Sequence, residues 1–98
     1  MYEFEYHKPA SVEDALAARN NASDGTFLAG GMTLLPTMKQ RLASPSDLVD
    51  IGGIAGLSGI SVDGGTVTIG ATTTHAEVAS SAEVKKAIPA LAYLAGLI

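Results

Sequence analysis

The residues with the clearest chemical potential are two adjacent glycines, Gly30 and Gly31, with Thr33 close behind them. The apolar run 27–29 before them is typical of a buried strand. After them, a helical pattern that Thr33 would cap is carried by Leu34, Leu35, Met38 and Leu42. A strand, a glycine turn and a helix start can hold a phosphate, because free N–H groups and the helix dipole attract an anion that glycine lets approach closely. The stretch therefore predicts a phosphorylated ligand, with a nucleotide cofactor as the leading candidate.

This signal is weak when it stands alone. A glycine pair between a strand and a helix is more often a plain connection. The chain contains neither the G-x-G-x-x-G fingerprint of dinucleotide-binding folds nor the G-x-x-x-x-G-K-[ST] loop of nucleoside triphosphatases. A ligand at this turn would be held by a different phosphate-binding loop.

The other residues that could do chemistry do not form a catalytic set. His7 and His75 are the only histidines, and each is interpreted as a surface or capping residue rather than a catalytic base. Metal sites need three or four clustered ligands, which the sequence does not offer. The acidic pair Glu13-Asp14 is explained by the start of a helix. The sequence therefore predicts no catalytic residue and no metal site, so any redox chemistry would belong to a cofactor.

Composition narrows the class of protein. The 98 residues are 47% hydrophobic and 16% charged, which suits a packed core rather than disorder. Six Lys and Arg in a chain of net charge −4 form no basic patch, which argues against nucleic-acid binding. The absence of cysteine excludes disulfides and cysteine-bound clusters within these residues, and it is compatible with the cytosol. No apolar run is long enough to span a membrane. The apolar stretch 87–98 suggests either a truncated domain or a last element that packs on something missing from this sequence.

The expected elements alternate between strands and helices before a hairpin. Strands are predicted at 2–7, 27–29 and 47–51, helices after Ser11 and Thr33, a hairpin at 59–69, and helices after Thr74, Ser80 and Pro89. Capping boxes are expected at Ser11–Asp14, Thr74–Glu77 and Ser80–Glu83. Two successive strand–helix units favour parallel pairing. The expected fold is α/β (α+β), with a small mainly parallel sheet flanked by helices and a β-hairpin.

Three segments resemble one known family. They are AGGMTLLPTMK at 29–39, LVDIG at 48–52 and VTIGATTTH at 67–75. Together they resemble the FAD-binding medium subunit of molybdenum hydroxylases, the group that includes carbon monoxide dehydrogenase and xanthine dehydrogenase. The resemblance covers nearly all 98 residues in order. It implies that residues 1–98 are the N-terminal subdomain of a PCMH-type FAD-binding domain, ending before a second glycine-rich loop.

The resemblance also implies the site and the partners. Backbone amides of the turn would wrap the FAD pyrophosphate, which names Ala29, Gly30, Gly31, Met32, Thr33 and Leu34. Position 32 is often polar in the family, and a backbone contact would survive the Met32 found in this sequence. The partner subunits would be a molybdopterin-binding large subunit and a small subunit with 2Fe-2S clusters. Electrons would pass from molybdenum through those clusters to FAD and an external acceptor.

Two alternatives stay open at this stage. One is a fragment of a stand-alone flavin oxidase, and the other is a non-catalytic module that packs against partners without binding FAD alone. Gly31→Val is expected to abolish FAD binding by blocking the approach of the ligand, while far-ultraviolet circular dichroism stays nearly unchanged.

Overall fold

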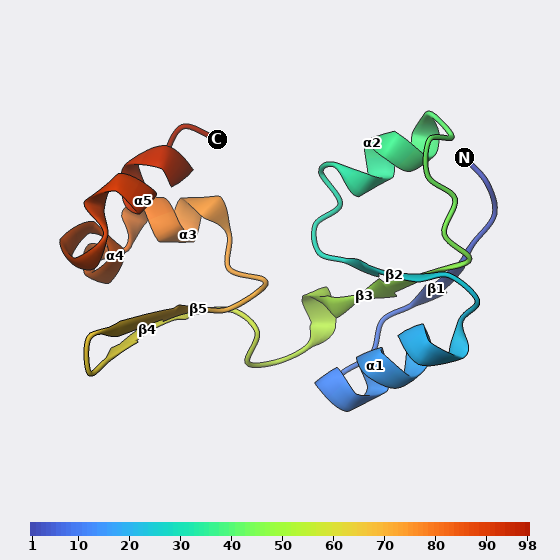
Figure 1. The fold of residues 1–98 in the computed structure, drawn as a ribbon, viewed down its shortest axis with the longest axis horizontal. Helices are drawn as coiled ribbons and strands as arrows, with labels where there is room; N and C mark the ends of the chain where they lie inside the picture. Colours follow the sequence, from blue (N-terminus) through green and yellow to red (C-terminus); the bar gives the residue numbers. More distant parts are fainter. The chain divides into compact units, whose positions relative to one another are not determined.

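The computed structural model describes residues 1–98, which form two compact units, Met1–Ala55 and Gly56–Ile98 (Figure 1). The first unit contains β1 (Glu5–His7), α1 (Val12–Asn21), β2 (Gly25–Leu28), α2 (Leu34–Lys39), β3 (Asp47–Asp50) and the 3-10 turn η1 (Ile51–Gly53). The second unit contains β4 (Ile60–Asp63), β5 (Thr66–Ile69), α3 (His75–Ser80), α4 (Ala82–Ala87) and α5 (Pro89–Ala95). Each unit is described by itself below.

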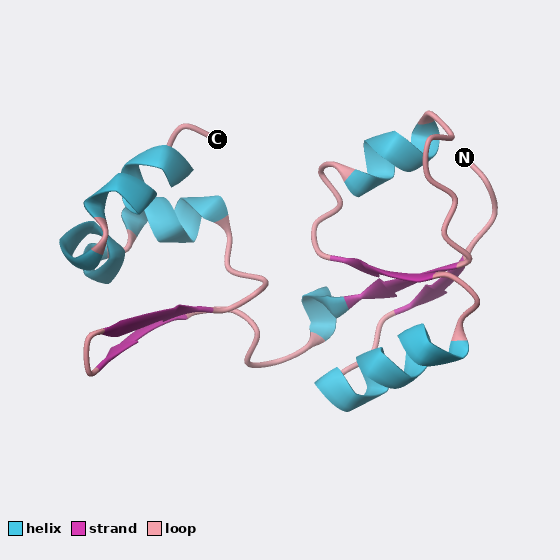
Figure 2. Ribbon diagram, in the orientation of Figure 1, coloured by secondary structure: helices cyan, strands magenta, loops and turns pink.

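The first unit is built on a three-stranded parallel sheet with strand order β1-β3-β2. Leu48 of the central strand pairs with Tyr6 on one side and Thr26 on the other. Helices α1 and α2 cover opposite faces of this sheet (Figures 1 and 2). The predicted parallel pairing and the α/β class are both confirmed.

The core of the first unit follows from the alternation of side chains along β3. Leu48 is buried against Leu28 and Met38 on the face that α2 covers. Its neighbour Val49 is fully buried and points to the other face, which α1 covers. A strand buried on both faces in this way is typical of the centre of a parallel sheet.

Of the predictions for the first 28 residues, the helix cap is confirmed and the two strands differ from what was expected. Ser11 caps α1 as predicted, and its side chain accepts a hydrogen bond from the Asp14 N–H at 3.1 Å. The first strand is shorter than the predicted 2–7, because only Glu5–His7 pairs with β3. In β2 only Leu28 is buried, whereas Phe27 is 40% exposed, so the prediction of a fully buried strand is wrong there.

The second unit combines an antiparallel hairpin with three short helices. Asp63 pairs with Thr66, which leaves the two glycines between them as a two-residue loop. Both halves of the predicted capping box at Thr74 are present at the start of α3. The box predicted at Ser80 is wrong, because Ser80 is the last residue of α3 and bonds the Ala76 carbonyl. Ser81 caps α4 instead.

The core of the second unit lies between the hairpin and the helices. Its buried residues are Val78, Val84, Ala92 and Ala95, packed against Ile60, Val67 and Ile69 from the hairpin. The end of the chain remains apolar and exposed at Tyr93, Leu94, Leu97 and Ile98. None of the helices in either unit combines the length and the apolar character needed to cross a lipid bilayer.

Candidate functional site

The glycine turn connects the carboxyl end of β2 to the first residue of α2. Gly30 and Gly31 both have left-handed backbone conformations, with φ angles of 75° and 79°. Residues other than glycine rarely adopt such angles. Two such residues in succession turn the chain out of the sheet and upward into α2 (Figure 1).

The backbone N–H groups of this turn have no acceptor within the chain. From Gly30 through Leu34, none of the five N–H groups donates a hydrogen bond to a carbonyl or a side chain. The first bonds of the region start later, with the Leu35 N–H to the Gly31 carbonyl at 3.0 Å and the Thr37 N–H to the Thr33 carbonyl at 3.1 Å. Successive free N–H groups in a turn of this kind form a concave binding site for anions.

The two glycines differ in what surrounds them. A Cβ placed on Gly30 would have no atom within 4 Å. A Cβ placed on Gly31 would lie 2.7 Å from Leu35 side-chain atoms and 3.0 Å from Leu28 Cδ1. Gly31 therefore faces the core, and only Gly30 borders open space. The expectation that Gly31→Val would act on the ligand alone is wrong, because that change would first disrupt the packing between α2 and the sheet.

Thr33 and Leu34 lie where the sequence predicted the start of a helix, but the predicted side-chain cap is missing. Thr33 precedes the first residue of α2, but its side chain makes no capping hydrogen bond. Helix α2 has six residues, so its dipole adds little to the attraction of an anion. The predicted helical position Leu42 lies beyond the end of α2. Met32 is 89% exposed, so its side chain packs on nothing within this chain. An anion at this position would therefore meet the turn amides rather than the dipole of a long helix.

The remaining polar groups of the first unit join strands rather than form a reactive centre. His7 Nε2 lies 2.7 Å from Asp47 Oδ2, and Ser46 Oγ donates to Asp47 Oδ1 at 2.7 Å. The hydrogen bonds to His7 and then to Ser46 lower the pKa of Asp47. His7 was interpreted as a surface or capping residue, and the structure shows that it pairs β1 with β3. The sequence did not reveal this pair, because only the strand register brings residues 7 and 47 together.

A second carboxylate lies on the opposite face of the same two strands. Asp50 accepts hydrogen bonds from the Tyr6 hydroxyl and from the Gly52 N–H. The bond from Tyr6, followed by that from Gly52, lowers the pKa of Asp50, and the same contact with Asp50 raises the pKa of Tyr6. No group of three or more histidines, aspartates or glutamates is placed to hold a metal ion. His75 is exposed at the start of α3.

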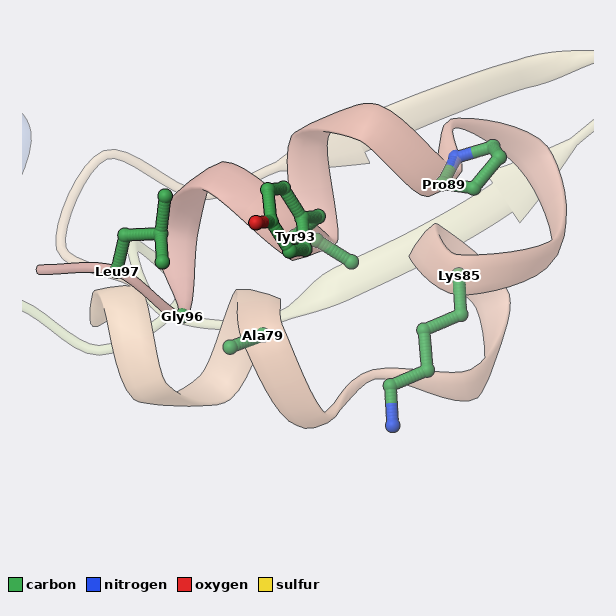
Figure 3. Close-up of a pocket in the computed structure, with 7 residues that line it drawn as sticks. Ala79, Lys85, Pro89, Tyr93, Gly96 and Leu97 are labelled. Carbon is green, nitrogen blue, oxygen red and sulfur yellow. The ribbon is translucent and has the colours of Figure 1, made fainter.

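Two hollows lie away from the glycine turn. One, of about 510 Å³, is bordered by Glu3, Phe4, Glu5 and Ser46 in the first unit. The other, of about 390 Å³, lies in the second unit, where Pro89, Tyr93 and Leu97 line one side of an apolar depression and Ala79 lies across from them (Figure 3). Neither hollow includes residues 29–34, so the candidate site is defined by its row of unbonded donors.

Comparison with known proteins assigns this chain to a family. The sequence profile described as "FAD binding domain in molybdopterin dehydrogenase" matches residues 2–98. The chain belongs to this family. The resemblance noted in the sequence is thereby confirmed.

Named relatives agree with the family assignment. The chain is 48% identical to the carbon monoxide dehydrogenase medium chain of Hydrogenophaga pseudoflava over 97% of its own length and 33% of that relative. It is 40% identical to the nicotine 6-hydroxylase medium subunit of Paenarthrobacter nicotinovorans over 89% of its length and 31% of that relative. The chain thus spans about a third of the length of the relatives it matches.

Solved structures confirm the fold of this FAD-binding family. Carbon monoxide dehydrogenase from Hydrogenophaga pseudoflava, in a form lacking the Mo-pyranopterin moiety, superposes with a TM-score of 0.93 at 47% identity, covering 99% of this chain and 34% of that one. Quinoline 2-oxidoreductase from Pseudomonas putida 86 gives 0.90 at 33% identity, covering 96% and 33%. A parallel three-stranded sheet with helices, followed by an antiparallel hairpin, is therefore the fold of this region in the family.

Proposed function

We propose that the chain supplies part of the FAD site in the flavoprotein subunit of a molybdenum hydroxylase of the carbon monoxide dehydrogenase type. The diphosphate of FAD would be held by the backbone of the turn formed by Ala29, Gly30, Gly31, Met32, Thr33 and Leu34. The observation that carries this proposal is the row of five N–H groups without acceptors at the carboxyl end of β2. Open parallel α/β sheets commonly bind ligands at this edge.

The residues of the turn fit such a group. Gly30 leaves space beside the donors, because no side chain would fill it. Gly31 packs on Leu35, which fixes the turn and holds the N–H groups in place before the ligand arrives. The exposed Thr33 hydroxyl is uncommitted to capping and can add a further donor. Bound FAD would supply the redox chemistry, and the chain would bind and orient it.

The wider role of the subunit is also part of the proposal. Several relatives are named as medium chains or medium subunits, which supports a place in a complex of several chains. The partners would be a molybdopterin-binding large subunit and an iron–sulfur small subunit. The flavoprotein subunit would then receive electrons from the 2Fe-2S clusters and pass them to an external acceptor. No side chain of this segment is required as an acid or a base.

A ligand titration tests the site. We expect FAD and ADP, which both carry a diphosphate, to raise the melting temperature, and FMN and riboflavin to do so much less. Gly30→Asn should weaken FAD binding about tenfold or more, since Asn tolerates the left-handed backbone but places its side chain among the donors. The matched control is Gly64→Asn, because Gly64 also has a positive φ, of 54°, and no atom within 4 Å of an added Cβ.

The outcomes separate the proposal from its alternative. If FAD gives no more stabilisation than riboflavin, the chain is better described as a packing module that does not bind the cofactor by itself. If Gly30→Asn and Gly64→Asn bind FAD equally well, the diphosphate is not at the glycine turn.

A further inference from the structure

The central strand of the parallel sheet ends where the connections on its two sides separate. After β1 the chain passes to α1 on one face of the sheet, and after β2 it passes through the glycine turn to α2 on the other face (Figure 1). The end of β3 lies between these two connections. Open α/β sheets bind ligands at such a point, beyond the carboxyl ends of the strands. The residue that ends β3 is Asp50.

Asp50 is next to the strand that leads into the glycine turn. It is the register partner of Leu28, the last residue of β2, and Gly30 follows two residues later. With about 4.8 Å between strands and about 3.3 Å per residue, the Cα atoms of Asp50 and Gly30 are at most roughly 8 Å apart. Because side chains alternate, Asp50 lies on the same face as Leu48, which is the face that α2 covers. A single nucleotide can therefore reach both Asp50 and the turn.

Two hydrogen bonds hold the Asp50 carboxylate and leave part of it available. The Tyr6 hydroxyl donates to Oδ2, and the Gly52 N–H donates to Oδ1 at 2.9 Å. The bond from Tyr6, then that from Gly52, lowers the pKa of Asp50, so the group is ionised at neutral pH. A carboxylate has about four acceptor positions, so two remain for donors from a ligand.

An ionised carboxylate at this place favours only some ligands. Like charges repel, so Asp50 would weaken the binding of a bare diphosphate at the neighbouring turn. It would favour a diphosphate that also carries a hydrogen-bond donor, as the sugar of a nucleotide does. In dinucleotide-binding folds, an Asp or Glu about 20 residues after the glycine loop accepts a hydrogen bond from the ribose. Asp50 has this spacing from Gly30, although the glycine loop itself is different.

We propose that Asp50 is a second contact of the cofactor site and accepts a hydrogen bond from a sugar hydroxyl of FAD. The spacing from Gly30 favours the ribose of the ADP half, and the ribityl chain of the flavin half offers the same chemistry. Tyr6 and Gly52 hold the carboxylate in place for this contact. This inference rests on the proposed binding of FAD at the glycine turn.

The test compares three ligands that share a diphosphate and differ in their hydroxyl groups. Calorimetric titrations of the chain use FAD, ADP and inorganic pyrophosphate. Asp50→Asn should weaken FAD and ADP about fivefold or more, and should tighten pyrophosphate about twofold because a repulsive charge is removed. The matched control is Asp47→Asn, the same change at the opposite end of β3, where Asp47 also accepts hydrogen bonds from two side chains. It should leave all three affinities unchanged.

A second measurement needs no variant. ADP that lacks both ribose hydroxyls should bind the unmodified chain about fivefold more weakly than ADP does, if the contact is with the ribose. Weakening of FAD and ADP together by Asp50→Asn assigns the contact to the ribose, whereas weakening of FAD alone assigns it to the ribityl chain. A merely structural role for Asp50 would weaken pyrophosphate as well, so equal weakening of all three ligands would overturn the inference.

The remaining outcomes separate this inference from the proposed function. If FAD binds and responds to Gly30→Asn but not to Asp50→Asn, the contact with Asp50 is wrong and the glycine turn stands. If FAD responds to Asp50→Asn but not to Gly30→Asn, the diphosphate is misplaced and the contact with Asp50 stands. Equal effects of Asp47→Asn and Asp50→Asn overturn the inference, and a chain that binds neither FAD nor ADP overturns both proposals.

Discussion

Two glycine pairs turn the chain, one in each unit, and they have positive φ angles in different surroundings. Gly30 and Gly31 have φ angles of 75° and 79°, and Gly64 and Gly65 have 54° and 84°. The second pair closes a hairpin in which Asp63 and Thr66 are paired directly, with open space around both glycines. The first pair follows the last residue of a strand, and its second glycine faces the core. The N–H groups from Gly30 to Leu34 have no acceptor in the chain.

The difference shows that the glycine dipeptide is not itself the signal for a ligand. In the hairpin, positive φ angles match the twist of the two strands, which is sufficient reason for glycine. In the strand–helix turn, no strand returns to use the donors, so the N–H groups remain available. The two turns therefore differ in whether their surroundings leave backbone N–H groups without an acceptor. Substitutions at the two pairs should have different effects for this reason.

Valine at the second glycine of each pair should give the largest contrast. Gly31→Val adds a collision with Leu35 to an unfavourable left-handed backbone, so we expect a loss of about 3–5 kcal/mol in the free energy of unfolding. A Cβ on Gly65 has no atom within 4 Å, so Gly65→Val should lose about 1–2 kcal/mol, mainly from the left-handed backbone. Urea denaturation measures both values. Equal losses would show that Gly31 does not face the core as described.

Local signals explain which parts of the fold could be predicted. The Ser11 cap, the Thr74 capping box and the hairpin around Gly64 depend on residues within a few positions of each other, and all three are confirmed. Parallel pairing followed from the order of the elements. The cap of α4 was missed by one residue, because Ser80 and Ser81 are chemically equal and only packing decides between them.

The remaining features depend on contacts that the sequence does not display. Gly30 and Gly31 look identical in sequence, and only the position of Leu35 against Leu28 shows which one faces the core. The pairing of His7 with Asp47 depends on the strand register. The family resemblance named residues 29–34 as the site, and the structure adds that the N–H groups of residues 30–34 are free.

Arg41 extends the comparison to a third left-handed turn, where glycine is missing. Arg41→Gly should raise the free energy of unfolding by about 0.5–1 kcal/mol, because relief of the backbone outweighs loss of the contact with Tyr2. Arg19→Gln removes a similar guanidinium–ring contact from a normal helical backbone and should lower stability slightly. Thermal and urea denaturation measure the stability of both variants. If Arg41→Gly lowered the stability, the left-handed backbone at Arg41 would not be the unfavourable feature inferred from its φ angle.

The hairpin pair offers a smaller, stabilising change. The angles at Gly64 and Gly65 fit a two-residue loop in which Asn-Gly is the preferred sequence. Gly64→Asn should therefore stabilise the protein by about 0.5 kcal/mol through lower entropy of the unfolded chain. Gly30→Asn should leave stability unchanged or slightly lower, since the preference for Asn-Gly belongs to two-residue hairpin loops and Gly30 links a strand to a helix. Differential scanning calorimetry without ligand compares the two, and a stabilising Gly30→Asn would contradict this distinction.

The smallest expected effect is on the pH dependence of stability, which should differ between the two units. Carboxylate hydrogen bonds join β1 to β3 through Asp47 and Asp50, whereas no side-chain hydrogen bond joins β4 to β5. Both aspartate pKa values are lowered from 3.8 by the bonds from His7 and Tyr6, so this stabilisation is present above pH 3.8 and is lost as pH falls through the lower folded-state values. The pKa of Tyr6 is raised from 10.0, so its contribution is present below pH 10.0 and is lost as pH rises through the folded-state value.

Hydrogen-exchange protection of single amides tests this contrast. Protection of β1 should fall at both pH extremes, and protection of the hairpin should not follow it, because its ladder contains backbone groups only. Tyr6→Phe should remove the alkaline loss and reduce the acid loss, since one of the two carboxylates then has no partner on β1. Asp47→Asn should reduce the acid loss and leave the alkaline loss in place. If the hairpin lost protection in step with β1, the side-chain bonds between β1 and β3 would not be what titrates.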